Sequence, residues 1–134
     1  QICSRPVELV DIYPTLAELT GLTPPNDLDG YSLVSLLEDP FAEWEHPAYT
    51  QVQRGDIAGH SVRTQLWRYT EWRFGEKGSE LYNEETDPQE LHNLASNPTY
   101  SEVVRQMKAL LHKAHPVPVV GGKAFQDTKK RYSD

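Results

Sequence analysis

An apolar stripe runs through residues 100–114, directly after a series of short strand-like segments. Asn97 can cap a helix over this stretch, and Pro98 suits its first position, where the missing N–H would have had no partner. The stripe recurs at helical spacing and comprises Tyr100, Val103, Val104, Met107, Leu110, Leu111 and Ala114. Because a sheet with one apolar face needs a cover, strands followed by such a helix predict an α+β unit.

Four segments before this helix are rich in aromatic and β-branched residues: "HPAYTQVQ", "GHSVRT", "WRYTEWRF" and "SELYN". The loops between them contain Arg54-Gly55-Asp56 and "GEKGS", so we predict three or four antiparallel strands. Side chains alternate along a strand. In the third segment, alternation puts Arg68, Thr70 and Trp72 on one face and Trp67, Tyr69 and Glu71 on the other.

The first 40 residues predict two helices. Asp11 can cap a helix over 11–20 through the amide of Tyr13, and Gly21 is typical of a helix end. The apolar positions of this helix are Ile12, Leu16 and Leu19. A turn-rich connection then leads to a short helix over 32–38, which Pro40 prevents from extending.

Charge and hydropathy exclude several classes of protein. The chain carries a formal net charge of -7, whereas nucleic-acid binders gather Lys and Arg on one face. Its basic run, Lys129-Lys130-Arg131, is interpreted as a solvated tail. No apolar stretch approaches the roughly 20 residues of a membrane span, and no signal-peptide pattern is found, so we expect a soluble chain. One cysteine, Cys3, allows no internal disulfide.

Two groups of residues superficially resemble functional sites. Asp56, His60 and Ser61 have the residue types of a catalytic triad, but neighbours on a strand point to opposite faces. The polar residues before Gly30 resemble a calcium loop, yet aligning that glycine with the loop's glycine puts Pro25 and Leu36 at ligand positions. We interpret the segment, which contains Asn26, Asp27 and Asp29, as an ordinary turn.

Two further candidates are a histidine pair and the cysteine. His112 and His115 lie near a helix end and could share a metal, but no third ligand is nearby in sequence. We therefore interpret them as a solvated pair, favoured by the helix dipole. Cys3 is interpreted as a buried or incidental thiol. Composition and spacing alone thus reveal no catalytic machinery, and no metal-binding residues are predicted in this chain.

Four motifs occur in order: "VELVDIYPTLAELTGL", "LDGYSLVSLLEDP", "GHSVRTQLWRYTEW" and "ELYNEETDPQELHNLASNP". Together they resemble the C-terminal portion of a sulfatase of the alkaline-phosphatase superfamily, closest to the iduronate-2-sulfatase-like branch. The resemblance implies that residues 1–40 end a large α/β domain and that 41–115 form a small antiparallel sheet covered by a C-terminal helix. Residues 116–134 are expected to be extended or disordered.

The same resemblance implies a whole enzyme that hydrolyses a sulfate ester of a sugar, with calcium and a formylglycine matured from a C/S-x-P/A-x-R motif. This motif is absent here, and Cys3-Ser4-Arg5-Pro6 has the residue types in the wrong order. We therefore expect this chain to be inactive alone, with the N-terminal catalytic part of the same sulfatase as its partner. Sulfatases of this kind are usually exported or lysosomal.

Two alternatives remain open at this stage. The first keeps the superfamily and replaces the sulfate ester by a phosphonate or phosphodiester. The second is a freestanding, non-enzymatic α+β binding module.

Three residues are candidates for contact with an anionic sugar: Gln51, Arg54 and Arg63. Val62 is expected to face the covering helix, so Arg63 should face away from it, where the large domain would dock. A forked ion pair across that domain interface is the favoured role of Arg63.

Overall fold

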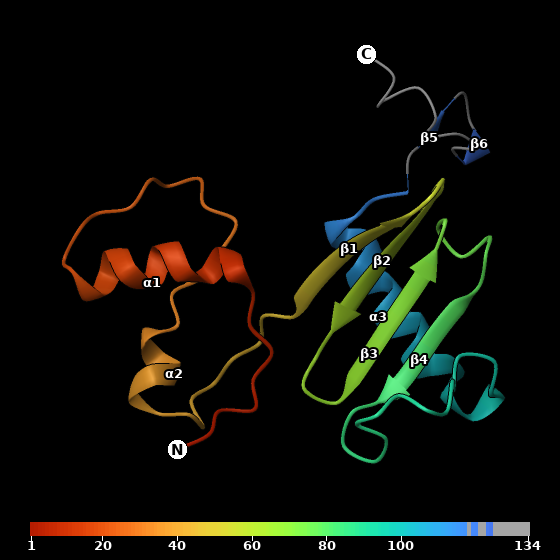
Figure 1. The fold of residues 1–134 in the computed structure, drawn as a ribbon, viewed down its shortest axis with the longest axis horizontal. Helices are drawn as coiled ribbons and strands as arrows, with labels where there is room; N and C mark the ends of the chain where they lie inside the picture. Colours follow the sequence, from red (N-terminus) through yellow and green to blue (C-terminus); the bar gives the residue numbers. More distant parts are fainter. Residues whose placement is uncertain (118, 121–122, 125–134) are drawn as a thin grey trace. The chain divides into compact units, whose positions relative to one another are not determined.

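The computed structural model describes residues 1–117, 119–120 and 123–124 of the chain (Figure 1). Two compact units are present, Gln1–Ala48 and Tyr49–Asp134. Most of the predicted tail, 116–134, lies outside the described residues; within it, strands β5 (Val119–Val120) and β6 (Lys123–Ala124) pair antiparallel. Over the described part of the chain, no helix has the length and apolar character that a bilayer crossing requires.

The first unit contains the predicted helices, as α1 (Ile12–Leu19) and α2 (Val34–Glu38), with a 3-10 turn, η1 (Leu9–Asp11), before α1. Helix α1 ends as its sequence predicts. Gly21 has a φ of 69° and donates to the carbonyl of Glu18, while Leu22 donates to that of Ala17. These two bonds satisfy carbonyls that the helix end would otherwise leave unpaired.

Asp11 does not cap α1 through Tyr13, and this prediction is wrong. Its carboxylate accepts the N–H of Glu8 at 2.8 Å and the N–H of Tyr31 at 2.9 Å. The reason is that η1 runs directly into α1, which gives Asp11 a helical φ of -72° instead of the extended conformation of a cap. The carboxylate, 3% exposed, ties the start of α1 to the segment before α2.

A close backbone approach completes the first unit. A Cβ at Gly30 would overlap the carbonyl of Val10, so only glycine fits there. The Thr15 hydroxyl joins the two helices, since it donates to the carbonyl of Asp11 and accepts the N–H of Leu33. Few apolar side chains are buried in this unit, among them Ala17 and Leu36.

The second unit contains a four-stranded sheet in the order β1 (Ala48–Arg54), β2 (Ile57–Arg63), β3 (Trp67–Trp72) and β4 (Ser79–Asn83). The central strand β3 pairs antiparallel with β2 and with β4. It ends at Trp72, two residues before the predicted "WRF" end. Arg73 and Phe74 take positive φ values of 48° and 54° and start the loop to β4 instead.

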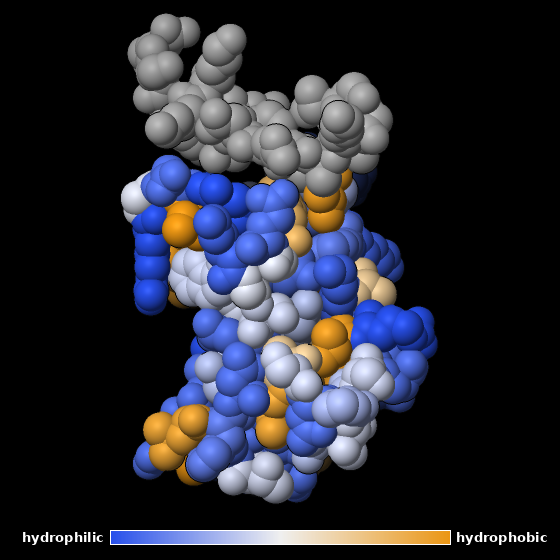
Figure 2. All heavy atoms as spheres, turned by 90° about the vertical axis from the view of Figure 1, so that its right-hand side faces the viewer, coloured by the Kyte–Doolittle hydropathy of each residue, from blue (hydrophilic) through white to orange (hydrophobic). Residues whose placement is uncertain are grey.

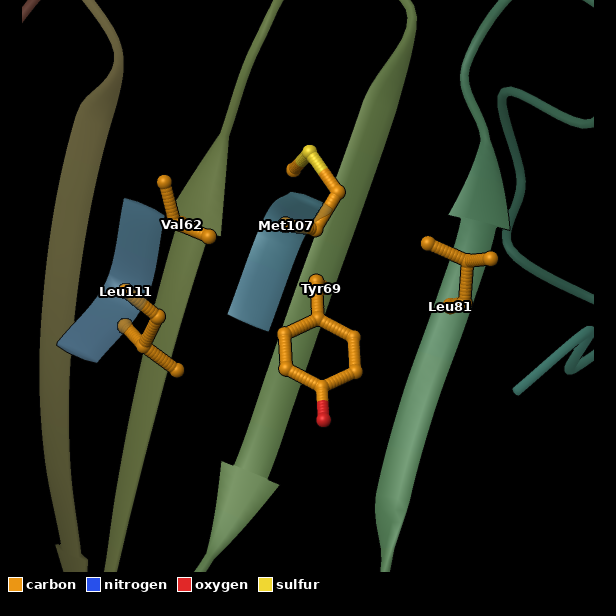
Figure 3. Close-up of a cluster of buried hydrophobic side chains, with 5 residues drawn as sticks. All are labelled: Val62, Tyr69, Leu81, Met107 and Leu111. Carbon is orange, nitrogen blue, oxygen red and sulfur yellow. The ribbon is translucent and has the colours of Figure 1, made fainter. Parts of the chain in front are cut away.

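The predicted cover is helix α3 (Ser101–Ala114), preceded by the 3-10 turn η2 (Pro98–Tyr100). Asn97 caps this turn as predicted, because its side chain accepts the N–H of Thr99 at 3.0 Å. Figure 3 shows the core where α3 meets the sheet; its buried members are Val62, Tyr69, Leu81, Met107 and Leu111. The stripe is shorter than predicted, since Ala114 is exposed.

The segment between β4 and η2 is fastened to the sheet by side-chain oxygens. Asn93 Oδ1 accepts the N–H groups of Leu81 and Ala95, and its amide donates to the carbonyl of Ser79. Asp87 accepts the N–H groups of Leu91 and His92 at 3.1 and 2.8 Å. These bonds hold the crossover in place beside β4, in agreement with a structural role for this polar segment.

Candidate functional site

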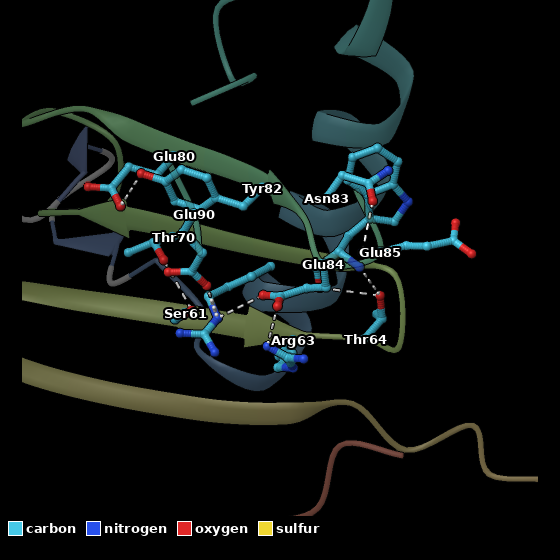
Figure 4. A network of polar contacts seen from close by, with 12 residues as sticks. Ser61, Arg63, Thr64, Thr70, Glu80, Tyr82, Asn83, Glu84, Glu85 and Glu90 are labelled. Atoms are coloured by element: carbon cyan, nitrogen blue, oxygen red, sulfur yellow. Dashed lines mark hydrogen bonds and ion pairs between the residues drawn. The ribbon is translucent and has the colours of Figure 1, made fainter. Parts of the chain in front are cut away.

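Two faces of the sheet offer different chemistry. Helix α3 covers one face, with the apolar core described above. The opposite face, called here the open face, carries the remaining side chains of the central strands: Gly59, Ser61, Arg63, Arg68, Thr70, Trp72, Glu80 and Tyr82. Polar and aromatic groups dominate it, as the network in Figure 4 illustrates.

The three predicted contact residues do not share one face. Val62 is buried against α3, as predicted, so Arg63 belongs to the open face. Arg54 also lies there, because its guanidinium carbon sits 5.0 Å from the centre of the Trp72 ring. Gln51 lies two residues after Tyr49 on β1, so the two side chains share a face, and Tyr49 packs on the core; Gln51 therefore belongs to the α3 side. The structure therefore brings Arg54 and Arg63 to one face and separates Gln51 from them.

Arg63 has a carboxylate partner within its own unit, which the sequence did not suggest. Its Nη1 lies 2.7 Å from Glu84 Oε2 (Figure 4). Arg68 Nε lies 2.9 Å from Glu90 Oε1. The Glu84 side chain is only 6% exposed. Burial raises the pKa of the Glu90 carboxyl; Arg68 opposes this shift, and the neighbouring Glu84 adds to it. The four groups form an alternating network at one end of the open face.

At the other end of the open face, Trp72 is fixed in position. Its ring lies over Gly59 on β2, where a Cβ would come within 2.7 Å of a ring carbon. Its indole N–H donates to Glu80 at 2.9 Å, and Tyr82 donates to the other oxygen of the same carboxylate at 3.3 Å. Between the two ends, the Thr70 hydroxyl donates to that of Ser61 at 3.1 Å.

The covered face contains a buried carboxylate that sequence reasoning missed. Glu71 is 1% exposed and accepts from Tyr69 at 2.8 Å, Lys108 at 2.9 Å and His112 at 2.7 Å. Burial raises the pKa of Glu71, but the hydrogen bonds from His112, Lys108 and Tyr69 outweigh burial and leave the pKa below its usual value. A signal was available, because alternation already put Glu71 on the apolar face of its strand.

The interpretation of His112 and His115 as a solvated pair is wrong. His112 bonds Glu71, while the His115 ring lies 5.1 Å from that of His60 and 5.9 Å from that of Tyr49. The cause is that His112 on α3 and His115, which directly follows α3, both point toward the sheet. Burial, followed by the nearby His115, lowers the pKa of His60.

The superficial resemblances to functional sites are resolved by position. His60 faces α3 while Ser61 bonds Thr70 on the open face, so Asp56, His60 and Ser61 form no triad, as predicted. Asp56 instead pairs with Arg73 at 3.1 Å.

Cys3 is exposed, which excludes the interpretation of a buried thiol. Among the described residues, no three His, Cys, Asp or Glu side chains gather in a metal-binding arrangement.

Known proteins share both the sequence pattern and the fold of this chain. Residues 3–116 match the family model described as N-sulphoglucosamine sulphohydrolase, C-terminal. A Delta 4,5-hexuronate-2-O-sulfatase from Bacteroides thetaiotaomicron is 33% identical over 107 residues, which cover 76% of this chain and 22% of that protein. The solved structure of a 2-O GAG sulfatase has a TM-score of 0.69 and 30% identity, over 78% of this chain and 23% of that one.

The chain therefore belongs to the family of sulfatase C-terminal domains, as its four motifs predict. The predicted α+β fold is confirmed as well. The structure of a phosphonate monoester hydrolase from Agrobacterium radiobacter is also similar, with a TM-score of 0.58 and 28% identity over 78% of this chain and 24% of that one. This chain spans about a quarter of the length of these relatives.

Proposed function

We propose that this chain is the C-terminal part of a sulfatase that hydrolyses a sulfate ester of a sugar, and that it completes the fold of that enzyme. The match of residues 3–116 to the sulfatase C-terminal family carries the proposal. Relatives described as a hexuronate-2-O-sulfatase and a 2-O GAG sulfatase support a sulfated sugar as the substrate class.

The apolar surface of the first unit supports a further domain as its partner. Ile12, Leu16 and Leu19 on α1 are 48%, 55% and 59% exposed, although their spacing is that of a packed helix face. Exposed apolar areas of this kind mark surfaces that another part of a protein covers. We assign that role to the N-terminal catalytic part of the same enzyme.

Calcium and formylglycine belong, in this proposal, to that catalytic part. The described residues fit neither group, since no three His, Cys, Asp or Glu side chains among them gather to hold a metal ion. Cys3 is followed by Ser4, Arg5 and Pro6 in the wrong order for a maturation motif, and the Arg5 guanidinium donates to the carbonyls of Phe41 and Ala42. The chain alone should therefore have no sulfatase activity.

Activity assays test the proposal in two parts. The purified chain should release no product from a chromogenic aryl sulfate above a buffer blank, with or without calcium. The protein encoded together with the sequence upstream of Gln1 should contain a C/S-x-P/A-x-R motif and release sulfate. Turnover by the chain alone would contradict the assignment of roles. Hydrolysis of a phosphonate monoester in place of the sulfate ester would favour the phosphonate hydrolase, which one solved structure supports weakly.

Arg63 is proposed to contact the catalytic part and not the sugar. Its side chain is 35% exposed on the open face, with Glu84 holding one of its nitrogens, so the rest of the guanidinium can reach a second carboxylate. In the whole enzyme, Arg63→Lys would keep the charge and lose the fork. We expect a lower melting temperature and a nearly unchanged KM. A raised KM with unchanged stability would instead assign Arg63 to the substrate.

A further inference from the structure

An open pocket of about 320 Å³ lies at the Trp72 end of the open face. Its lining consists of Arg54, Ile57, Trp72, Lys77 and Glu80. The residues come from β1, β2, β3, β4 and the loop between β3 and β4. The indole ring and the two cations of this pocket belong neither to the apolar core nor to the salt-bridge network of Arg63 and Glu84.

Trp72 gives the pocket a rigid, flat wall. Its ring rests on Gly59, the one residue type that leaves room for it at this cross-strand position. Its N–H is bonded to Glu80, so the ring cannot turn without losing that bond. A ring held in this way offers apolar contact area with little loss of conformational entropy on binding.

The three charged side chains of the pocket differ in the partners that they have within the chain. Glu80 accepts hydrogen bonds from both Trp72 and Tyr82, so its carboxylate is already occupied. Within the described part of the chain, Arg54 and Lys77 form no ion pair with a carboxylate. Arg54 lies over the ring at 5.0 Å and Lys77 is exposed. Two cations that have no carboxylate partner among the described residues make this pocket locally attractive to an anion, although the chain carries a net charge of -7.

We infer that this pocket binds an anionic saccharide, with a sugar ring against Trp72 and Ile57 and a sulfate or carboxylate between Arg54 and Lys77. The apolar C–H face of a pyranose suits a flat indole wall, and a planar guanidinium suits two oxygens of an anionic group. A nucleic acid fits less well, because its phosphate backbone needs an extended row of cations, whereas this pocket offers two beside one aromatic wall. Only the choice of a sulfated saccharide as ligand rests on the proposed function.

Isothermal titration calorimetry of a heparin tetrasaccharide binding to the purified chain tests the inference. The measurement involves no catalytic step. Arg54→Ala and Lys77→Ala should each weaken binding by about tenfold, the loss expected for one charged hydrogen bond. The matched controls are Arg105→Ala and Lys113→Ala on α3, which remove the same charges from the other side of the sheet. Neutral maltotetraose should not bind.

Tryptophan fluorescence tests whether the ligand binds at the Trp72 ring. Binding should change the tryptophan fluorescence of the parent, and this change should be lost in Trp72→Phe, while the affinity stays nearly constant because an aromatic wall remains. Thermal melting of each variant checks that the fold is intact, and Arg54 and Lys77 are exposed enough to be replaced without unfolding.

Several outcomes would overturn the inference. They are equal weakening by the control variants, unchanged binding in Arg54→Ala and Lys77→Ala, or binding of hexaglutamate but not of the tetrasaccharide, which would assign the pocket to an acidic protein segment. The proposed function fails separately, if the enzyme that contains this chain releases no sulfate from any sulfated sugar. Saccharide binding would survive that result.

Discussion

The two units of this chain bury apolar side chains to very different extents. In the second unit, Val62, Leu81 and Leu111 are at most 1% exposed between the sheet and α3. In the first unit, Leu9 and Leu19 are 85% and 59% exposed although both lie in helical turns. One unit therefore closes its own core, while the other presents apolar surface that it cannot bury alone. The face drawn in Figure 2, which is the right-hand side of Figure 1, shows apolar areas separated by hydrophilic ones.

This difference indicates where the stability of the chain resides. Burial of apolar area is the main favourable contribution to folding, so the second unit should supply most of the free energy of unfolding. The first unit should gain its share only when a covering surface is present. The predictions below test this division, beginning with the largest expected effect.

Leu111→Ala should lower the free energy of unfolding of the second unit by about 3 kcal/mol, because a fully buried leucine leaves a cavity when truncated. Val104→Ala should cost only about 1 kcal/mol, since Val104 is half-buried at the rim of the same core. Urea denaturation followed by far-ultraviolet circular dichroism measures both. Losses below 1 kcal/mol at both positions would contradict the covering role of α3.

Leu16→Ala is the matched control in the first unit. The side chain is 55% exposed, so its truncation should cost less than about 1 kcal/mol in this chain. The variant should also bind less of a hydrophobic dye than the parent does. In the whole enzyme we expect the cost of Leu16→Ala to exceed that in the isolated chain. Equal costs in both settings would remove the argument that another domain covers α1.

Much of the second unit could be predicted from the sequence because its signals are local and agree with one another. The strand alternation around Val62 and Tyr69, the cap at Asn97 and the stripe through Leu111 all point to the same arrangement. The helix cap that was predicted from one residue type alone was wrong. Asp11 has the residue type of a cap, but the turn before it and the distant Tyr31 amide decide where its carboxylate goes.

The polar sites could not be predicted because their members meet only in three dimensions. Glu71 and His112 are 41 positions apart. Strand alternation puts Glu71 on the apolar face, but nothing in the sequence identifies His112 as its partner. Arg63 suggested a partner carboxylate, but nothing in the spacing identified Glu84. The pocket at Trp72 likewise joins residues from four strands and a loop, and only Arg54 among them was a sequence candidate.

Glu71→Gln should destabilise the second unit by about 2 kcal/mol, a smaller effect than that of Leu111→Ala. The amide can replace one acceptor oxygen, but its NH₂ group then faces a donor inside a buried site. Lys108 is partly exposed and can turn to water, which limits the loss. Urea denaturation at neutral pH measures the effect, and Glu76→Gln, in the exposed loop before β4, is the matched control.

Acidification should weaken the second unit in two steps, and Glu71→Gln should remove one of them. The folded state lowers the pKa of His60, so stability is complete above the unfolded value of about 6.5 and falls as pH drops below it. The pKa of Glu71 is lowered as well, so a second loss begins below about 4.5 as the unfolded chain takes up the proton first. The stability difference between parent and Glu71→Gln should therefore shrink below pH 4.5, while the loss below 6.5 persists in both. A difference that stays constant across the acid range would show that the charge of Glu71 contributes nothing beyond the shape of its side chain.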